Sequence, residues 1–410
     1  MKFSFDRKYM SLFQRLFVAV ATGLVGCASV DELVADPVTD GSSVDMQGVN
    51  AGFFLVVGDN AASASGYASR VPQSPEGGYD PGSGYENFID ILGRNFRFMF
   101  FDEAQRYLGQ FNVSDVDMVS ESGNATSKRY QVLGQIDEDV VTGRMVTVVA
   151  LANWPAYPSM AKGDPIAKVW NDQASCFTFG PESMMPSAEH PVPLYGVRRY
   201  NVDDLKFDPY GFTSLGTIHL LRAYAKVCVE CQSDDWTLRR VTMTRYNTVG
   251  RCAPEDVRDV DDYVHNSYAQ DYVGTPHLVA GAPVGTDLSF AADDRGGYTV
   301  YVPEFAIKSA EAEQRARIAV EFDESVAVYY IDFKYYVNPP EGVEQYAPFD
   351  ILRNYWYQFS INKVSEWGDL KLEIDVQPYA SVDLQPDFGF LRDDDGNIID
   401  AAGNIIWTRK

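Results

Sequence analysis

Residues 217–230 have the sequence TIHLLRAYAKVCVE, and this stretch decides the fold class. Apolar residues recur at every second position, which is the period of a strand with one buried face. Residues 238–246 form a second such stretch, and Gln232-Ser233-Asp234-Asp235 lies between the two, so we predict a hairpin. The expected buried face comprises Leu221, Ala223, Ala225, Val227 and Val229, with Arg222, Tyr224 and Lys226 on the opposite face.

Short runs rich in Val, Ile, Tyr and Phe recur along the rest of the chain and predict further strands. Only 308–317 (KSAEAEQRAR) has the composition of a helix, and it is short and wholly polar. We therefore expect an all-β protein with little helix, built as two β-sandwich domains in tandem. The further expected strands are 49–57, 94–101, 145–151, 298–302, 318–322, 326–336 and 355–363.

The C-terminal region adds one strongly alternating strand. Leu370, Leu372, Ile374 and Val376 alternate with charged or polar residues, so this strand has one buried face. The tail beyond it repeats Gly-Asn-Ile-Ile within 396–407. Two apolar pairs on a polar tail need cover, so this segment either closes a hairpin on its own domain or docks on another subunit.

The N-terminus has the features of a secretory signal. Basic residues, among them Lys2 and Arg15, precede an apolar stretch over 16–26 that is too short to cross a bilayer. The stretch ends in Leu24-Val25-Gly26-Cys27, which resembles a bacterial lipobox. We expect cleavage before Cys27 and acylation of its thiol, including palmitate. Two or three acyl chains there would anchor the protein in the cell outer membrane.

Composition sets further limits on function. The chain has 410 residues, enough for two domains at about 150 residues each. Its formal charge of −24 repels nucleic-acid phosphate, so nucleic-acid binding is not expected. With 46% hydrophobic residues the chain can bury sizeable cores.

Four cysteines remain after Cys27, and the sequence leaves their state open. One or two disulfides or single buried thiols are equally compatible with their number in an oxidising envelope. Cys228-x-x-Cys231 lies in an expected strand, with no His nearby and no second such pair, so we do not expect a metal site. The four residues are Cys176, Cys228, Cys231 and Cys252.

We find no catalytic or cofactor motif in the sequence, and an enzyme is not expected. The four histidines, at 190, 219, 265 and 277, are scattered singly, and no phosphate-binding or nucleophile motif occurs. Asp393-Asp394-Asp395-Gly396 lacks the first and twelfth ligands of a calcium loop. A surface glycan-binding lipoprotein stays an alternative, because the tryptophans at 154, 236, 356, 367 and 407 could stack on sugars, although most of them lie in apolar runs, where core packing is expected.

The order of short motifs resembles the fimbrillin family, the type V pilus subunits of Bacteroidales-type bacteria. The resemblance extends over most of the chain but departs from the family's major subunits after about Asp387. It rests on Cys27, Glu86-x-x-Ile89, Phe101-Asp102, Ala152-Asn153, LLRAYAKV at 220–227, 236–247, Tyr301-Val302-Pro303-Glu304, and Phe349 to Asn354 leading into 355–364.

The resemblance implies transthyretin-like Greek-key sandwiches and assembly by donor-strand exchange. An Arg-specific protease removes the lipidated N-terminus with its strand, and a C-terminal strand of the next subunit fills the groove. Arg70 is the first basic residue after Cys27, in a Gly/Ser/Ala-rich loop, so we expect cleavage between Arg70 and Val71 and loss of strand 49–57. The expected donor strand contains Leu370, Leu372, Ile374 and Val376, with 396–407 as the alternative.

The expected domains follow from this order of segments. They are a signal peptide at 1–26, a lipidated propeptide at 27–70, an N-terminal sandwich at 71–205, a C-terminal sandwich at 206–386 and a tail at 387–410. The expected partners are other copies of the chain or related pilus subunits, the outer membrane and the protease. A membrane-retained anchor subunit of the same pilus, with an intact N-terminus, is the other alternative.

Overall fold

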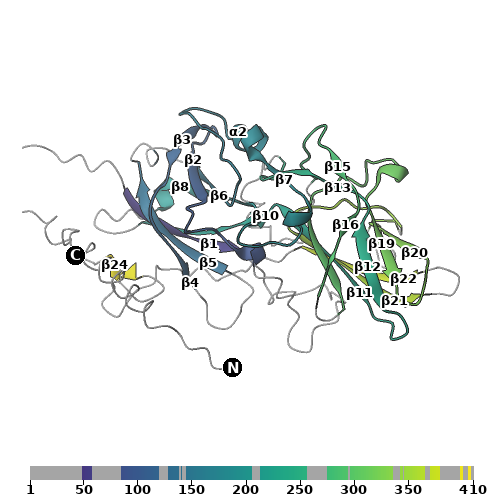
Figure 1. Cartoon of the computed structure of the whole chain (residues 1–410). Coiled ribbons are helices and arrows are strands. Elements are labelled where there is room, and N and C mark those ends of the chain that lie inside the picture. Colours follow the sequence, from purple (N-terminus) through teal and green to yellow (C-terminus); the bar gives the residue numbers. More distant parts are fainter. Residues whose placement is uncertain are drawn as a thin grey trace, which may run out of the picture. The chain divides into compact units, whose positions relative to one another are not determined.

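The computed structural model describes most of the chain from residue 49 onward, and nearly all of it is β-structure (Figure 1). The described residues are 49–57, 85–119, 128–137, 140, 145–205, 213–255, 275–293, 296–335, 342–344, 346–364, 370–378, 398–399 and 405–407. Cys27, Arg70, Val71 and the acidic run Asp393–Asp395 lie outside them.

The strands and helices begin and end as follows. The first half contains β1 (Val49–Val57), β2 (Phe96–Phe101), β3 (Tyr107–Gln110), β4 (Asn112–Val119), β5 (Lys128–Ile136), β6 (Met145–Ala152), β7 (Cys176–Thr178), β8 (Leu194–Asn201), β9 (Thr213–His219) and β10 (Leu221–Arg222). The second half contains β11 (Tyr224–Cys231), β12 (Leu238–Met243), β13 (Tyr246–Asn247), β14 (Val249–Arg251), β15 (Val284–Gly285), β16 (Leu288–Ser289), β17 (Ala291–Ala292), β18 (Tyr298–Pro303), β19 (Arg317–Phe322), β20 (Val328–Asp332), β21 (Tyr355–Val364) and β22 (Leu370–Pro378). The tail adds β23 (Ile398–Ile399) and β24 (Ile405–Trp407). The helices are α2 (Ala167–Asn171) and the 3₁₀ turns η2 (Tyr85–Asn87), η4 (Gln173–Ser175), η5 (Pro181–Ser183), η6 (Val202–Asp204) and η7 (Ala312–Gln314).

Four larger sheets form two sandwiches, as the sequence predicted for the fold class. In the N-terminal half the β1 sheet, of order β4-β5-β1-β9, packs on the β6 sheet, of order β10-β8-β6-β2-β3. The rings of Phe53 in β1 and Phe98 in β2 meet at 4.8 Å between centroids. In the C-terminal half the β11 sheet, of order β17-β18-β11-β21-β22, packs on the β19 sheet, of order β16-β12-β19-β20. There Phe333, just after β20, meets Phe359 of β21 at 5.4 Å.

Sheet membership changes at Ala223, later along the chain than the domain boundary expected between 205 and 206. Strand β9 pairs in parallel with β1, and β10 pairs with β8, so both belong to the N-terminal sheets. Strand β11 is the first to join the C-terminal sheets. The proline- and glycine-rich composition of 180–216 therefore does not mark the change of sheet. The exact domain limits stay a prediction.

Three local predictions were wrong. Strands β11 and β12 do not form a hairpin, because they lie in the two opposite sheets of one sandwich and residues 232–237 cross between them. In the polar run 308–317 the only helical part is η7, and Arg317 already begins β19, whereas the short helix α2 buries Val169 and Trp170. The stretch 217–230 was expected as one strand with one buried face, but it is divided among β9, β10 and β11, and Arg222, Tyr224 and Lys226 on the opposite face are buried as well.

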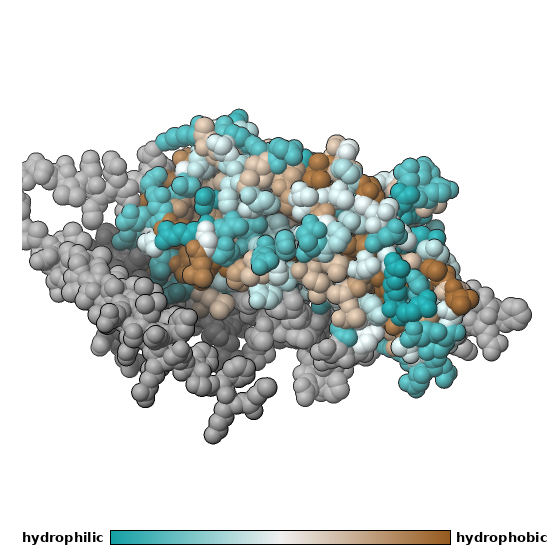
Figure 2. All heavy atoms as spheres, in the orientation of Figure 1, coloured by the Kyte–Doolittle hydropathy of each residue, from teal (hydrophilic) through white to brown (hydrophobic). Residues whose placement is uncertain are grey.

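On the face shown in Figure 2 the described surface carries hydrophobic and hydrophilic side chains in small mixed groups. None of the described helices is long and apolar enough to span a membrane.

Candidate functional site

The first candidate site is the position that β1 occupies inside its sheet. Strand β1 lies between β5, to which it runs antiparallel, and β9, to which it runs parallel. Leu55 of β1 faces Tyr130 of β5 on one side and Ile218 of β9 on the other. A strand hydrogen-bonded on both sides is central to its sheet, although this one comes from the N-terminal end of the described chain.

The side chains of β1 contribute to the core of the N-terminal sandwich. Phe53 is 0% exposed and packs on Phe98 and on Phe111, whose ring centroid lies at 5.2 Å. Ala51 and Leu55, at period two from Phe53, are buried in the same core. Complete burial of a phenylalanine or leucine side chain contributes about 1.5–3 kcal/mol, so this strand is a large part of the local stability.

The other face of β1 is also closed. Phe54 is buried, and the guanidinium of Arg129 in β5 lies 3.8 Å from the centroid of its ring. Such a cation–π contact adds to the burial of the ring. Without β1 the neighbouring strands β5 and β9 would face each other across an open, apolar strand-shaped groove.

The expected donor strand lies in the C-terminal half. Strand β22 includes Leu370, Leu372, Ile374 and Val376 and forms the edge of the β11 sheet, antiparallel to β21. The alternative donor segment contains β23 and β24, which pair with each other in a separate two-stranded sheet. Strand pairing in one chain does not test which of the two is donated.

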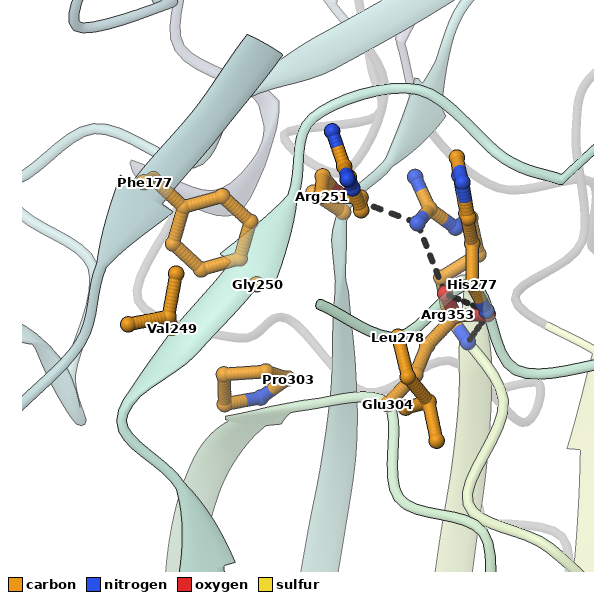
Figure 3. Close-up of a pocket in the computed structure, with 10 residues that line it drawn as sticks. Phe177, Val249, Gly250, Arg251, His277, Leu278, Pro303, Glu304 and Arg353 are labelled. Carbon is orange, nitrogen blue, oxygen red and sulfur yellow. Dashed lines mark hydrogen bonds and ion pairs between the residues drawn. The ribbon is translucent and has the colours of Figure 1, made fainter. Parts of the chain in front are cut away.

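The second candidate site is a buried ion pair near the start of β21. Figure 3 shows Glu304 and Arg353 among the residues that line a small pocket, with Phe177, Val249 and Pro303 on its other side. Arg353 Nη2 lies 2.7 Å from Glu304 Oε2, and both side chains are almost fully buried. The pocket contains about 180 Å³ of empty space, part of it open to solvent, and is too narrow for a water molecule.

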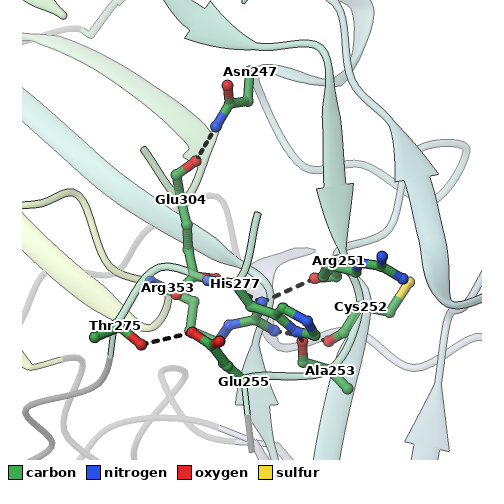
Figure 4. Close-up of polar contacts among 9 residues, drawn as sticks. All are labelled: Asn247, Arg251, Cys252, Ala253, Glu255, Thr275, His277, Glu304 and Arg353. Carbon is green, nitrogen blue, oxygen red and sulfur yellow. Dashed lines mark hydrogen bonds and ion pairs between the residues drawn. The ribbon is translucent and has the colours of Figure 1, made fainter. Parts of the chain in front are cut away.

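Both side chains of this pair also hold backbone groups in place (Figure 4). The guanidinium of Arg353 donates to the carbonyls of Arg251 (3.0 Å) and Cys252 (2.9 Å). The carboxylate of Glu304 accepts from the backbone N–H of Arg353 at 3.1 Å and of His277 at 3.0 Å. A carboxylate with both oxygens occupied in this way holds a fold together and is poorly placed for proton transfer.

His277 belongs to the same cluster. Its Nδ1 lies 2.9 Å from the carbonyl oxygen of Ala253, and nearby Thr275 donates to the carboxylate of Glu255 at 2.6 Å. Burial lowers the pKa of His277 below its ordinary value, against the effect of the Ala253 carbonyl. These contacts join 253–255 to 275–277.

The cysteines show no sign of shared chemistry. Cys176, Cys228, Cys231 and Cys252 are free thiols in the structure. Trp356 donates its indole N–H to Cys228 Sγ at 3.2 Å, and burial raises the pKa of Cys252 well above its ordinary value. Among the described residues no group of three or more His, Cys, Asp and Glu side chains is arranged to bind a metal ion.

Sequence reasoning did not predict which residues of the family-like motifs contact one another in the folded chain. Glu86, Arg222 and Asn354 come from three different motifs, and the structure brings them into one buried hydrogen-bond network. The local signal is a charged residue, Arg222, directly after the apolar pair Leu220-Leu221. Their meeting depends on the packing of the two halves, which no local pattern encodes.

No family model matches the chain, and no curated protein matches it. Several solved structures are similar to it. The tip fimbrial protein Mfa3 from Porphyromonas gingivalis, with a C-terminal truncation, has 12% identity and a TM-score of 0.46, over 80% of this chain and 100% of that one. A fimbrial assembly protein from Parabacteroides distasonis has 12% identity and a TM-score of 0.42, over 80% of this chain and 99% of that one. Fimbrial proteins, the class that the order of the motifs resembles, are thus among the similar structures.

Proposed function

We propose that this chain is a structural subunit of a cell-surface fimbria that serves adhesion and polymerises by donor-strand exchange. One observation carries the proposal: β1, the strand that would be removed, is a central strand of its sheet and is buried on both faces. Its loss leaves a groove with two unpaired edges and an open core, which a strand from another subunit would fill.

The location of β1 in the chain supports this role. The strand ends at Val57, and the next described element, η2, begins at Tyr85. Arg70 lies in the segment between them, so a single cut after Arg70 separates β1 from the rest of the chain without interrupting another described element. Until that cut, β1 protects the groove and keeps the precursor from premature assembly.

The N-terminus supports an exported precursor. The lipobox-like Leu24-Val25-Gly26-Cys27 motif would attach the precursor to the outer membrane before processing, and the protease would release it for assembly. For the incoming strand we retain β22, with Leu370, Leu372, Ile374 and Val376, because its apolar residues at every second position could occupy the core face that Ala51, Phe53 and Leu55 of β1 fill. Segment 396–407 is the alternative.

The test is N-terminal sequencing of the protein in filaments sheared from the cell surface. A start at Val71 supports the proposal, because it shows that β1 has been discarded from the polymer. Arg70→Ala should then leave unprocessed monomers, whereas Lys162→Ala, a basic residue elsewhere in the chain, should leave assembly unchanged. An acylated Cys27 on protein that stays in the membrane would contradict this mechanism and identify an anchor subunit.

A further inference from the structure

Residues 86–90, here called the junction segment, follow directly on the first residue of η2 and are held by polar side chains from distant parts of the chain. Tyr130 of β5 holds them from the groove side: its hydroxyl accepts from the N–H of Ile89 at 2.9 Å and donates to the carbonyl of Asn87 at 3.2 Å. Burial raises the pKa of Tyr130 to about 12, so the hydroxyl keeps its proton for this bond.

A second side chain holds the junction segment from β6. Asn153, which follows that strand, accepts from the N–H of Asp90 at 3.1 Å and donates to the carbonyl of Phe88 at 2.6 Å. Its own backbone adopts a left-handed conformation with φ of 60°. Asparagine tolerates this conformation better than most residues, so the position suits the residue found there.

Arg222 completes the network and links it to the C-terminal half. Its side chain is 1% exposed. Nε donates to the carbonyl of Glu86 at 3.2 Å and to Asn87 Oδ1 at 3.1 Å, and Nη2 also donates to Asn87 Oδ1. Nη1 donates to Asn354 Oδ1 at 3.0 Å. The planar fork of the guanidinium reaches both asparagines at once, which a lysine cannot do.

These contacts connect the β1 site to the start of β21. Tyr130 lies opposite Leu55 of β1 in the sheet. Asn354 directly precedes β21, and its N–H donates to the carbonyl of Tyr224 at 2.9 Å. Tyr130, the junction segment, Arg222 and Asn354 thus form one buried chain of hydrogen bonds, and β1 is not part of it.

We propose that Arg222 is a positioning residue for strand uptake, which fixes the junction segment and, through it, Tyr130, so that the groove keeps its shape after β1 has left. The inference rests on the proposed function. The junction segment lies after Arg70, so processing leaves it in place. While β1 is present, its side chains also pack beside Tyr130, but in the emptied groove the hydroxyl bonds are the remaining restraint from this side.

A merely structural role predicts a different pattern. Loss of a general structural contact weakens the chain equally before and after processing. Loss of the proposed restraint matters chiefly once β1 is gone, because among the described strands β5 then pairs with β4 alone and keeps the hydrogen bonds to the junction segment. Arg353 is the matched control: it is also 1% exposed, but its hydrogen bonds go to Glu304, Arg251 and Cys252, within the C-terminal half.

The experiment compares wild-type, Arg222→Ala and Arg353→Ala full-length chains before and after treatment with an Arg-specific protease. Two quantities are measured: hydrogen exchange of the amides in 128–136, and uptake of a synthetic peptide with the sequence of residues 49–57. Before cleavage we expect the 128–136 amides of Arg222→Ala to exchange like those of wild type, because β1 still pairs with β5. After cleavage its β5 amides should exchange about tenfold faster, and its peptide uptake should fall about tenfold, as loss of buried hydrogen bonds implies. In Arg353→Ala, cleavage should not produce this additional rise in β5 amide exchange or this additional loss of peptide uptake.

The inference would be overturned if cleaved wild type and cleaved Arg222→Ala showed equal amide exchange in 128–136 and equal peptide uptake. It would also be overturned if these amides in Arg222→Ala already exchanged faster than in wild type before cleavage. A third contradicting result would be the same response to cleavage in Arg353→Ala. If Arg222→Ala does not fold, Arg222→Lys takes its place, because it keeps the buried charge but reaches only one asparagine; it should show the same conditional loss. If cleaved wild type keeps its own β1 and takes up no peptide, the proposed function fails, and the inference fails with it.

Discussion

The N-terminal and C-terminal sandwiches follow one plan with one difference. In each half the first strand is central, between an antiparallel and a parallel partner: β1 between β5 and β9, and β11 between β18 and β21. Residues 232–237 join β11 closely to β12, whereas residues 58–84 separate β1 from the next described element. The central strand β11 is thus tied closely to the rest of its half, whereas β1 is the strand that we propose to be removed.

The two corresponding sheets also differ in whether the parallel partner of the central strand has a further strand beside it. In the C-terminal half β22 lies beyond β21, so the parallel partner is itself covered. In the N-terminal half β9 is the last strand of its sheet among the described residues. The C-terminal half contains β22, the edge strand that we propose to be donated. The N-terminal half contains β1, the strand that we propose to be removed, and it would receive the donated strand.

The largest expected effect comes from truncating matched core phenylalanines in the two halves. Phe53→Ala in β1 and Phe359→Ala in β21 each remove a fully buried ring and should cost about 3–5 kcal/mol in the free energy of unfolding. After cleavage and loss of β1, the cost of Phe53→Ala should disappear, while that of Phe359→Ala should persist. Urea unfolding of both forms measures this. A cost of Phe53→Ala that survives processing would show that β1 stays in the subunit.

The next largest effect is expected at the buried ion pair of the C-terminal half. Glu304→Gln removes the charge that compensates Arg353 and should cost about 3 kcal/mol, because the guanidinium is left buried without its counter-charge. The same change at Glu321, which pairs with Arg239 at the surface, should cost less than about 1 kcal/mol. Thermal or urea unfolding compares the two variants. Equal costs would mean that the buried pair does not hold the C-terminal half.

The smallest effect is a pH dependence confined to the C-terminal half. The pKa of His277 is lower in the folded chain than its ordinary value of 6.5, so the unfolded chain binds more protons as the pH falls. The contribution of His277 is complete above that value and is lost as the pH falls toward the folded pKa. The charged neighbours Arg353 and Arg251 lower this pKa further, and Glu304 opposes them.

Unfolding midpoints measured between about pH 8 and pH 5 test this effect, with segment-resolved hydrogen exchange to assign it to a half. His277→Gln should flatten the dependence in the C-terminal segments. An unchanged slope in that variant would show that other groups account for the acid sensitivity.

Much of the fold follows from local patterns. The expected strands 355–363 and 145–151 each formed a strand close to their expected limits, because a run of alternating or consecutive apolar residues favours a sheet. The stretch 217–230 also forms strands, but it is divided among β9, β10 and β11. The run 49–57 was expected as a strand and is β1. That β1 is central to its sheet was not visible in its sequence, since burial on both faces depends on distant partners.

The partners themselves were decided only in three dimensions. The polar residues 232–235 do connect two strands, as expected, but such residues suit both a hairpin and a crossing between sheets. The packing of the core places β11 and β12 in different sheets, so the connection is a crossing. The change of sheet at Ala223 was likewise not visible in the sequence, because composition marks loops and says nothing of which sheet a strand joins.

By itself, the sequence determined the strand-rich class, the lipobox-like N-terminus and the isolated Arg70, because each depends only on neighbouring residues. The tertiary structure alone decided that β1 completes a sheet between β5 and β9, and that Arg222 meets Asn87 and Asn354. The reason is physical: hydrogen bonds between strands and buried polar contacts join residues far apart in the chain, and their geometry is set only when the whole core packs.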